Sequence, residues 1–310
     1  MTVNTVDVTT ATGSETFPVN ANDPYQAVET IARQTIRSAE NGNALEDAFY
    51  EYEVENGKVI EEVVFKMAEK QAYDKNAFSR EAKDAVPLVK YFNNYESEQY
   101  QTTTRPDDVR AILTKDGNVD AVVGQIIDTL TQGENATDFE KKRTVLFGTQ
   151  FKNYSEILGG APANMKGVIY AIRNAYNHIK SNNTDLTTVA YKSATKVDDI
   201  RIALSDEVMN LIDVVELANI FNLSKEEILG KIIVVPVSDY DTKYKVVVYD
   251  IKALGRATRL YDYDQEKIAK GRYYNHYLTT ERAYFYNGLF KATQIDCTDA
   301  CTTAKAELIK

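Results

Sequence analysis

Apolar residues recur at helical spacing in three stretches of the chain. Between residues 118 and 153 they follow one another at intervals of three and one, and a glycine at position 133 predicts a kink. Residues 165–180 show the same spacing, which predicts a second helix. A third helix is expected over residues 23–42, because its first residues are an aspartate that can cap it and a proline suited to its first turn.

Alternating patterns predict strands in the first third of the chain. Over residues 50–55, tyrosines and a valine alternate with three glutamates, and Asn56-Gly57 follows, a dipeptide typical of tight hairpin turns. We therefore expect residues 50–65 to form a hairpin or the rim of a longer loop. Residues 100–104 predict another strand, and the segment 70–94 between them shows mixed preferences.

The remainder of the chain predicts short strands mixed with helices. A break is expected at Gly159-Gly160-Ala161-Pro162, and residues 205–211 predict a short capped helix. The first 22 residues hold no lasting period and predict an extended arm. Together these patterns indicate an α+β protein. The strands expected after the break lie at 198–203, 231–236, 244–250, 254–260, 272–278, 282–286 and 288–295.

The charge balance excludes two classes of protein. The chain has 36 basic and 46 acidic residues, a formal net charge of −10. Nucleic-acid binders and membrane-surface proteins usually carry a basic face, so neither class is expected. The first 23 residues carry three acids and no base, whereas residues 246–310 carry eight acids and ten bases. This gradient indicates either an ordinary solvated surface or complementary surfaces between copies of the chain.

Catalytic and metal-binding patterns are missing from the sequence. Two cysteines and two histidines cannot supply a zinc site at the usual spacing, and a reducing cellular origin is expected. No phosphate loop, dinucleotide fingerprint or nucleophile elbow occurs. Glu61 and Glu62 are adjacent, but on a strand they would point to opposite faces. We therefore predict no catalytic residue, no cofactor and no metal, and the remote alternative of an acid-pair hydrolase lacks its carboxylates.

Tyrosines and arginines gather toward the C-terminus. Residues 272–278 and 282–286 hold five of the 21 tyrosines, with Arg272 and Arg282 beside them. This mixture is typical of the centre of protein interfaces. It fits equally a sheet whose tyrosines lie partly in the core.

In four stretches the chain resembles the major capsid proteins of tailed bacteriophages, whose fold is shared with encapsulin shells and the herpesvirus capsid floor. The third stretch, with Leu-Ala-x-x-Phe-Asn at 217–222, is the most specific, and the order of the four carries the resemblance. The stretches are 43–46 leading to 57–63; 100–104 with 109–112 and the helix to 147; 213–222 with 230–234; and 248–250 with 274–278 and 284–292.

The resemblance implies a domain plan for the chain. An N-terminal arm and arm helix would occupy residues 1–46, and an extended loop residues 47–105. A peripheral domain with the spine helix would comprise 106–158 and 246–296, an axial domain 159–245, and a C-terminal tail 297–310.

The resemblance also implies a structural function without catalysis. The chain would assemble as hexamers and pentamers into the head shell of the virion, built in the host bacterial cytoplasm. Its partners would be copies of itself, portal and other head proteins, and packaged DNA touched without specificity, but no membrane. An encapsulin-like shell around protein cargo is the alternative. The residues expected at subunit interfaces are Tyr50, Tyr52, Asn56, Gly57, Glu61, Glu62, Tyr100, Arg272, Tyr274, Tyr277 and Arg282.

Overall fold

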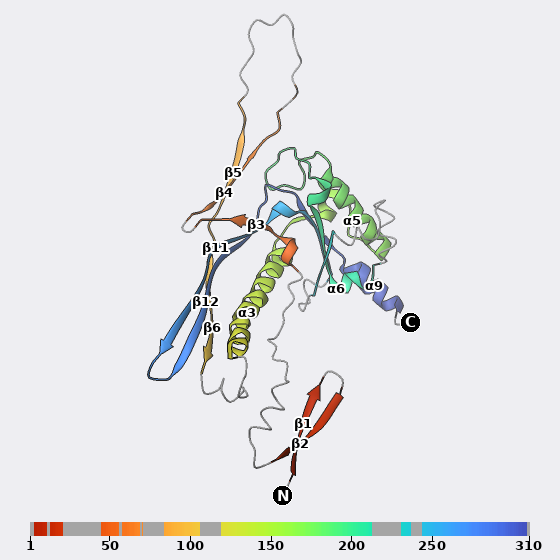
Figure 1. Cartoon of the computed structure of the whole chain (residues 1–310). Helices are drawn as coiled ribbons and strands as arrows, with labels where there is room; N and C mark the ends of the chain where they lie inside the picture. The colour runs from red at the N-terminus through yellow and green to blue at the C-terminus, as the bar shows by residue number, and fades with distance from the viewer. Residues whose placement is uncertain are drawn as a thin grey trace, which may run out of the picture. The chain divides into compact units, whose positions relative to one another are not determined.

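The computed structural model describes nine separate stretches of the chain (Figure 1). The helix predicted over 23–42, the dipeptide Asn56-Gly57 and the stretches 109–112 and 213–222 of the resemblance lie outside them. The described residues divide into two compact units, and the domain plan above stays a prediction. The first unit comprises 1–42, 97–137 and 261–280, and the second comprises 43–96, 138–260 and 281–310. The described stretches are 3–10, 13–20, 45–55, 58–68 with 70, 84–105, 119–212, 231–236 and 244–308.

A five-stranded mixed sheet forms the centre of the second unit. Its strand order is β7-β13-β10-β8-β9, with β10 antiparallel to both neighbours. The outer strands β7 and β9 run parallel to the strands beside them. The bounds are β7 Lys152–Asn153, β13 Ala292–Asp296, β10 Lys245–Asp250, β8 Ile200–Ser205 and β9 Ile232–Val235.

The central strand β10 is buried on both faces, which explains its continuous apolar run from Val246 to Tyr249. On β10, Val246 and Val248 belong to one core cluster, while Val247 and Tyr249 belong to another. Four helices lie in the same unit, and Figure 1 shows α5 beside the sheet. They are α4 Tyr154–Leu158, α5 Met165–Lys180, α6 Asp206–Met209 and α9 Thr298–Leu308.

The helix α5 begins and packs as its sequence predicts. Asn164 caps it by accepting a hydrogen bond from the backbone of Gly167. Its buried face, which includes Ile172 and Ile179, fills the first core cluster. Within the residues predicted as a C-terminal tail, Thr298–Leu308 form α9, and Cys297 and Cys301 are buried in the same cluster.

A four-stranded sheet, in the order β3-β11-β12-β6, contains the remaining long strands. β3 runs parallel to the start of β11 and β4 pairs elsewhere, so of the two alternatives predicted for residues 50–65 the local hairpin is wrong, and the rim of a longer loop stays a prediction. β12 is one strand where two were predicted. The bounds are β3 Tyr50–Glu53, β11 Leu254–Ile268, β12 Tyr273–Tyr286 and β6 Glu96–Thr104.

Two further ribbons are two-stranded and antiparallel. β4 (Ile60–Phe65) pairs with β5 (Pro87–Phe92), a strand within the segment whose pattern was mixed. β1 (Val3–Thr10) pairs with β2 (Gly13–Asn20), so the residues predicted as an extended arm form a two-stranded ribbon. Threonine and valine are frequent in these residues and favour strands even without strict alternation.

The longest helix, α3 (Val119–Gly148), continues through position 133. Gly133 lies inside this single helix of 30 residues and does not interrupt it, and the predicted kink there stays a prediction. Short 3-10 helices complete the described elements. They are η1 Glu46–Ala48, η2 Val197–Asp199 and η3 Ile251–Ala253.

The core around α5 gives a first prediction. Ile172 is fully buried, so we expect Ile172→Ala to lower the free energy of unfolding by about 2–5 kcal/mol through the lost contacts and the cavity left behind. Tyr170 on the same helix is 61% exposed, and Tyr170→Ala should change it by only about 0.5 kcal/mol. Urea denaturation of both variants provides the comparison, and equal losses would contradict this packing.

Candidate subunit-interface surface and a buried charge network

Four of the predicted interface residues lie at the start of β3 and on β4. Tyr50 is half-exposed, and its ring meets that of Tyr52 edge-on with centroids 4.9 Å apart. Tyr52 also packs near Phe285, at 5.4 Å between centroids. Burial, with the nearby Glu62 carboxylate, raises the pKa of Tyr52, so its hydroxyl stays protonated at neutral pH.

The two adjacent glutamates occupy different environments, as expected for neighbours on a strand. Glu61 is exposed and accepts a hydrogen bond from the Tyr91 hydroxyl at 2.9 Å. Glu62 lines a hollow of about 480 Å³ together with Tyr50 and Tyr52. Three of the four predicted residues therefore share one recess, and Glu61 lies outside it.

Four predicted residues belong to the first unit. The Tyr100 hydroxyl donates to Glu98 at 3.0 Å, and that of Tyr277 donates to Glu266 at 3.5 Å. The Lys267 ammonium lies 5.7 Å from the centre of the Tyr274 ring. Arg272 has a backbone φ of 52°, in the left-handed region that tight turns use. These residues are polar and partly exposed, and their role at an interface stays a prediction.

The last predicted residue, Arg282, belongs to a buried charge network. Its side chain is only 9% exposed, and its guanidinium lies 3.7 Å from the Asp138 carboxylate. Within this single chain Arg282 therefore forms ion pairs in the interior of the second unit. Little of its side-chain surface is exposed for contact with a neighbouring subunit.

Asp138 is the centre of that network. Its carboxylate, 3% exposed, lies 3.0 Å from the Lys142 ammonium and 3.0 Å from Nε of Arg256. The Tyr284 hydroxyl donates to it at 2.5 Å. Arg256 also donates to Glu51 on β3 at 2.8 Å. One carboxylate on α3 thereby joins the helix to strands β11 and β12, and through Arg256 to β3.

The network fixes the protonation of its members. Burial, together with the Asp138 charge, raises the pKa of the Tyr284 hydroxyl, so it remains a donor. Burial alone would lower the pKa of Arg256, but Asp138 and Glu51 outweigh that cost and raise it. The sequence analysis did not predict the role of Asp138, because Lys142, one helical turn away, is the one cationic partner of Asp138 that is close to it in sequence. That i, i+4 spacing was the sole available signal.

The β4–β5 ribbon exposes an apolar face that the sequence analysis also missed. Val63 lies opposite Val89 and Phe65 opposite Pro87, so these positions share one face. Phe65 is 61% exposed and Val89 is 44% exposed. The opposite face is covered, because the Phe92 ring stacks on that of Phe285 at 3.9 Å. The alternation within 60–65 was the signal for this one-sided ribbon.

Catalytic chemistry finds no support in the described part of the chain. No group of three potential metal ligands occurs among its residues. His178 bonds to Asp185 at 2.8 Å near the end of α5. His276 is buried between the Tyr263 hydroxyl, at 2.6 Å, and the Thr104 hydroxyl, at 2.9 Å. Each histidine serves the local structure.

None of the helices that the structure describes combines the length and the apolar character that a bilayer crossing requires.

The comparisons with known proteins agree with one another. The family model described as Phi29-like phage major capsid protein matches residues 3–305. The chain is 22% identical to the major capsid protein of Bacillus phage GA-1 over 236 residues, 73% of this chain and 50% of that protein. It is 20% identical to that of Bacillus phage PZA over 264 residues, 81% of this chain and 58% of that protein. The chain thus spans between half and three-fifths of these relatives.

Solved structures show the same fold. The capsid structure of Staphylococcus phage Andhra matches with a TM-score of 0.67 and 12% identity, over 85% of this chain and 87% of that chain. The structure of the head fiber and inner core protein gp22 of native bacteriophage P68 matches with a TM-score of 0.59 and 11% identity, over the same 85% and 87%. The predicted α+β capsid fold is therefore confirmed.

The Asp138 network gives a second prediction. Asp138→Asn keeps the shape but removes the carboxylate that pairs with the buried Lys142 and Arg282, whereas Arg256 keeps Glu51, so the free energy of unfolding should fall by about 3–5 kcal/mol. Glu140→Gln on the same helix is the matched control, because the Glu140 side chain is 56% exposed and its pair with Arg143 should contribute about 0–1 kcal/mol. Equal effects in chemical denaturation would show that the network is not a stabilising centre.

The buried histidine gives a third prediction, on pH. Burial lowers the pKa of His276 below its ordinary value. On acidification below about pH 6.5 the unfolded chain gains a proton at this position before the folded chain does, so stability falls. His276→Gln should remove that part of the loss. Denaturation curves between pH 7 and pH 5 test it, and parallel curves for the two proteins would refute it.

Proposed function

The chain belongs to the Phi29-like phage major capsid protein family, and from this premise we propose that copies of it assemble into the closed head shell of a tailed phage. The observation that supports assembly is the apolar face of the β4–β5 ribbon. A soluble monomer gains nothing from exposing Val63, Phe65 and Val89 together, whereas a subunit with neighbours can bury them.

The ribbon depends on neighbours for a physical reason. A two-stranded ribbon is marginal in water unless one face packs on something else. Its inner face already packs through Phe92, and the Lys90 ammonium donates to the backbone carbonyl of Tyr286 at 3.3 Å. Figure 1 shows β4 and β5 extending away from the five-stranded sheet, which leaves the outer face for an adjacent subunit.

The finer organisation follows the capsid family and is part of the proposal. Residues 47–105 would form the extended loop over the adjacent subunit. Residues 106–158 and 246–296 would form the peripheral domain, and residues 159–245 the axial domain. Copies would group as hexamers and pentamers in the virion head, assembled in the host cytoplasm and joined by a portal and other head proteins.

The proposed relation to DNA is one of containment. A net charge of −10 for each copy repels a polyanion. The shell would therefore confine the packaged DNA mechanically and make only weak, non-specific contacts with it. An encapsulin-like shell would instead enclose protein cargo. Nucleic acid or a cargo enzyme recovered from purified particles separates these two functions.

The ribbon face gives a fourth prediction. The triple variant Val63→Thr, Phe65→Thr, Val89→Thr keeps residues that favour strands but removes apolar surface. Burial of that surface contributes about 1–3 kcal/mol for a large side chain, so the yield of particles should fall at least about tenfold. Sedimentation and negative-stain micrographs measure it. Folding stability should stay near that of the unaltered chain.

The matched control is Tyr170→Thr, which removes an equally exposed aromatic residue from α5. Its particle yield should match that of the unaltered chain. An unaltered chain that remains monomeric at every concentration, alone and with its head proteins, would contradict the proposed function.

A further inference from the structure

The hollow of about 480 Å³ beside strands β3 and β4 lies entirely within the second unit. Its volume falls in the range of small-molecule sites, which is about 300–1,000 Å³. The end of one side chain would leave most of this volume empty, so the hollow has the size for a whole small molecule. Its lining consists of Tyr50, Glu51, Tyr52, Glu62, Lys252 and Phe290.

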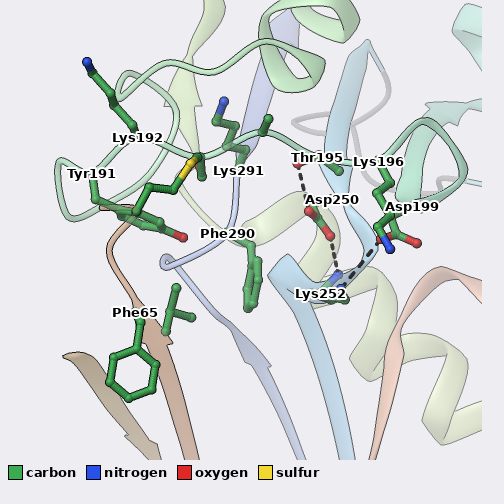
Figure 2. A pocket seen from close by; sticks show the side chains of 14 residues that line it. Phe65, Tyr191, Lys192, Thr195, Lys196, Asp199, Asp250, Lys252, Phe290 and Lys291 are labelled. Atoms are coloured by element: carbon green, nitrogen blue, oxygen red, sulfur yellow. Dashed lines mark hydrogen bonds and ion pairs between the residues drawn. The ribbon is translucent and has the colours of Figure 1, made fainter. Parts of the chain in front are cut away.

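Three aromatic rings belong to this lining. Tyr50 is 41% exposed, and its ring meets that of Tyr52 edge-on, with 4.9 Å between the centroids. Phe290 is the third, and it also lines a neighbouring hollow, where Figure 2 shows it between Phe65 and Lys252. Aromatic faces attract ammonium and guanidinium groups, most strongly where the cation is partly withdrawn from water. The rings therefore favour a cation that carries apolar groups.

Two of the three charged groups on the lining already have a partner. Glu51 accepts a hydrogen bond from the Arg256 guanidinium at 2.8 Å. The Lys252 ammonium lies 3.6 Å from the Asp199 carboxylate, a pair that Figure 2 draws as a dashed line. The third charge, that of Glu62, is therefore the one that a ligand can meet without displacing an existing ion pair.

The Glu62 carboxylate forms no ion pair within the part of the chain that the structure describes. Lys90 lies opposite it in the β4–β5 register, but the Lys90 ammonium donates to the backbone carbonyl of Tyr286 at 3.3 Å. Burial and the Glu62 charge raise the pKa of the Tyr52 hydroxyl, which hydrogen-bonds to Glu62 and stays protonated. Glu62 is thus held at the wall of the hollow by a neutral partner, and its negative charge remains for a ligand.

The lining suits an organic cation better than a metal ion. Ca²⁺ takes about six to eight oxygen ligands and Mg²⁺ about six. The hollow offers two carboxylates, and no group of three potential metal ligands occurs among the residues that the structure describes. An alkylammonium ion needs one carboxylate for its charge and apolar walls for its methylene groups, and both are present.

We propose that this hollow binds an organic cation of the alkyl diamine or polyamine class, with one ammonium group on Glu62 and the alkyl chain along the rings of Tyr50 and Phe290. The site does not depend on assembly, because every lining residue belongs to one chain. A bound diamine lowers the negative charge of a subunit whose formal net charge is −10, and so weakens the repulsion between neighbouring copies.

Equilibrium dialysis of the purified chain against radiolabelled cadaverine (1,5-diaminopentane) tests the site. Salt at about 0.15 M screens the diffuse attraction between exposed charges, so binding that remains is local. We expect saturable binding of one cadaverine for each chain. 1,5-Pentanediol has the same length without the charge, and it should compete at least about tenfold less well, because it forms no hydrogen bond between two charged groups.

The adjacent glutamates provide a matched pair of variants. Glu62→Gln removes the charge inside the hollow and should weaken cadaverine binding about tenfold. Glu61→Gln makes the same change in net charge outside the hollow and should leave binding unchanged. Tyr50→Leu keeps an apolar side chain but removes the ring, and should weaken binding about threefold. Circular dichroism verifies that each variant folds.

Several results of these measurements would overturn the proposal. They are the absence of saturable binding, equal competition by the uncharged diol, and equal weakening by Glu61→Gln and Glu62→Gln, which would indicate diffuse attraction only. N-acetyl-lysine methylamide represents a cation on a protein side chain, and its binding as tightly as cadaverine would assign the hollow to a protein partner instead. The comparison of cadaverine with the diol uses the unaltered chain, so it decides the question even where a variant does not fold.

Discussion

One buried carboxylate holds together the part of the molecule on which the rest depends. Asp138 lies on a long helix, yet its three cationic partners come from its own helix and from two strands more than a hundred residues later. A carboxylate and three cations are costly to bury separately and tolerable only together. These ion pairs therefore favour the packing of this part of α3 against Arg256 on β11 and Arg282 on β12.

The core of the second unit could be predicted because its signals are local. The apolar face of α5 recurs every three or four residues, and Asn164 is a good cap next to it. The strands β9 and β10 contain continuous apolar runs, and β10 is covered on both faces. The recognised order of motifs then supplied the capsid fold, which no single element would have indicated.

The pairing of strands depended on contacts far apart in sequence. Asn56-Gly57 favours a local turn, but β3 pairs with β11 some two hundred residues away, since Tyr52 packs on Phe285 and Glu51 binds Arg256. Arg282 was expected at a surface because arginine beside tyrosine is common at interfaces. Its burial against Asp138 required knowing that α3 lies there. Neither fact can be read from neighbouring residues.

The apolar outer face of the ribbon also affects the protein before any shell exists. Newly made chains collide in random orientations. An exposed apolar strand pair such as β4–β5 can then associate non-specifically with other chains before it meets its correct neighbour. Assembly of the shell therefore competes kinetically with aggregation of the subunits. The attraction between apolar groups weakens on cooling. Cells that produce this protein at a lower temperature should therefore convert a smaller fraction of it into insoluble aggregates.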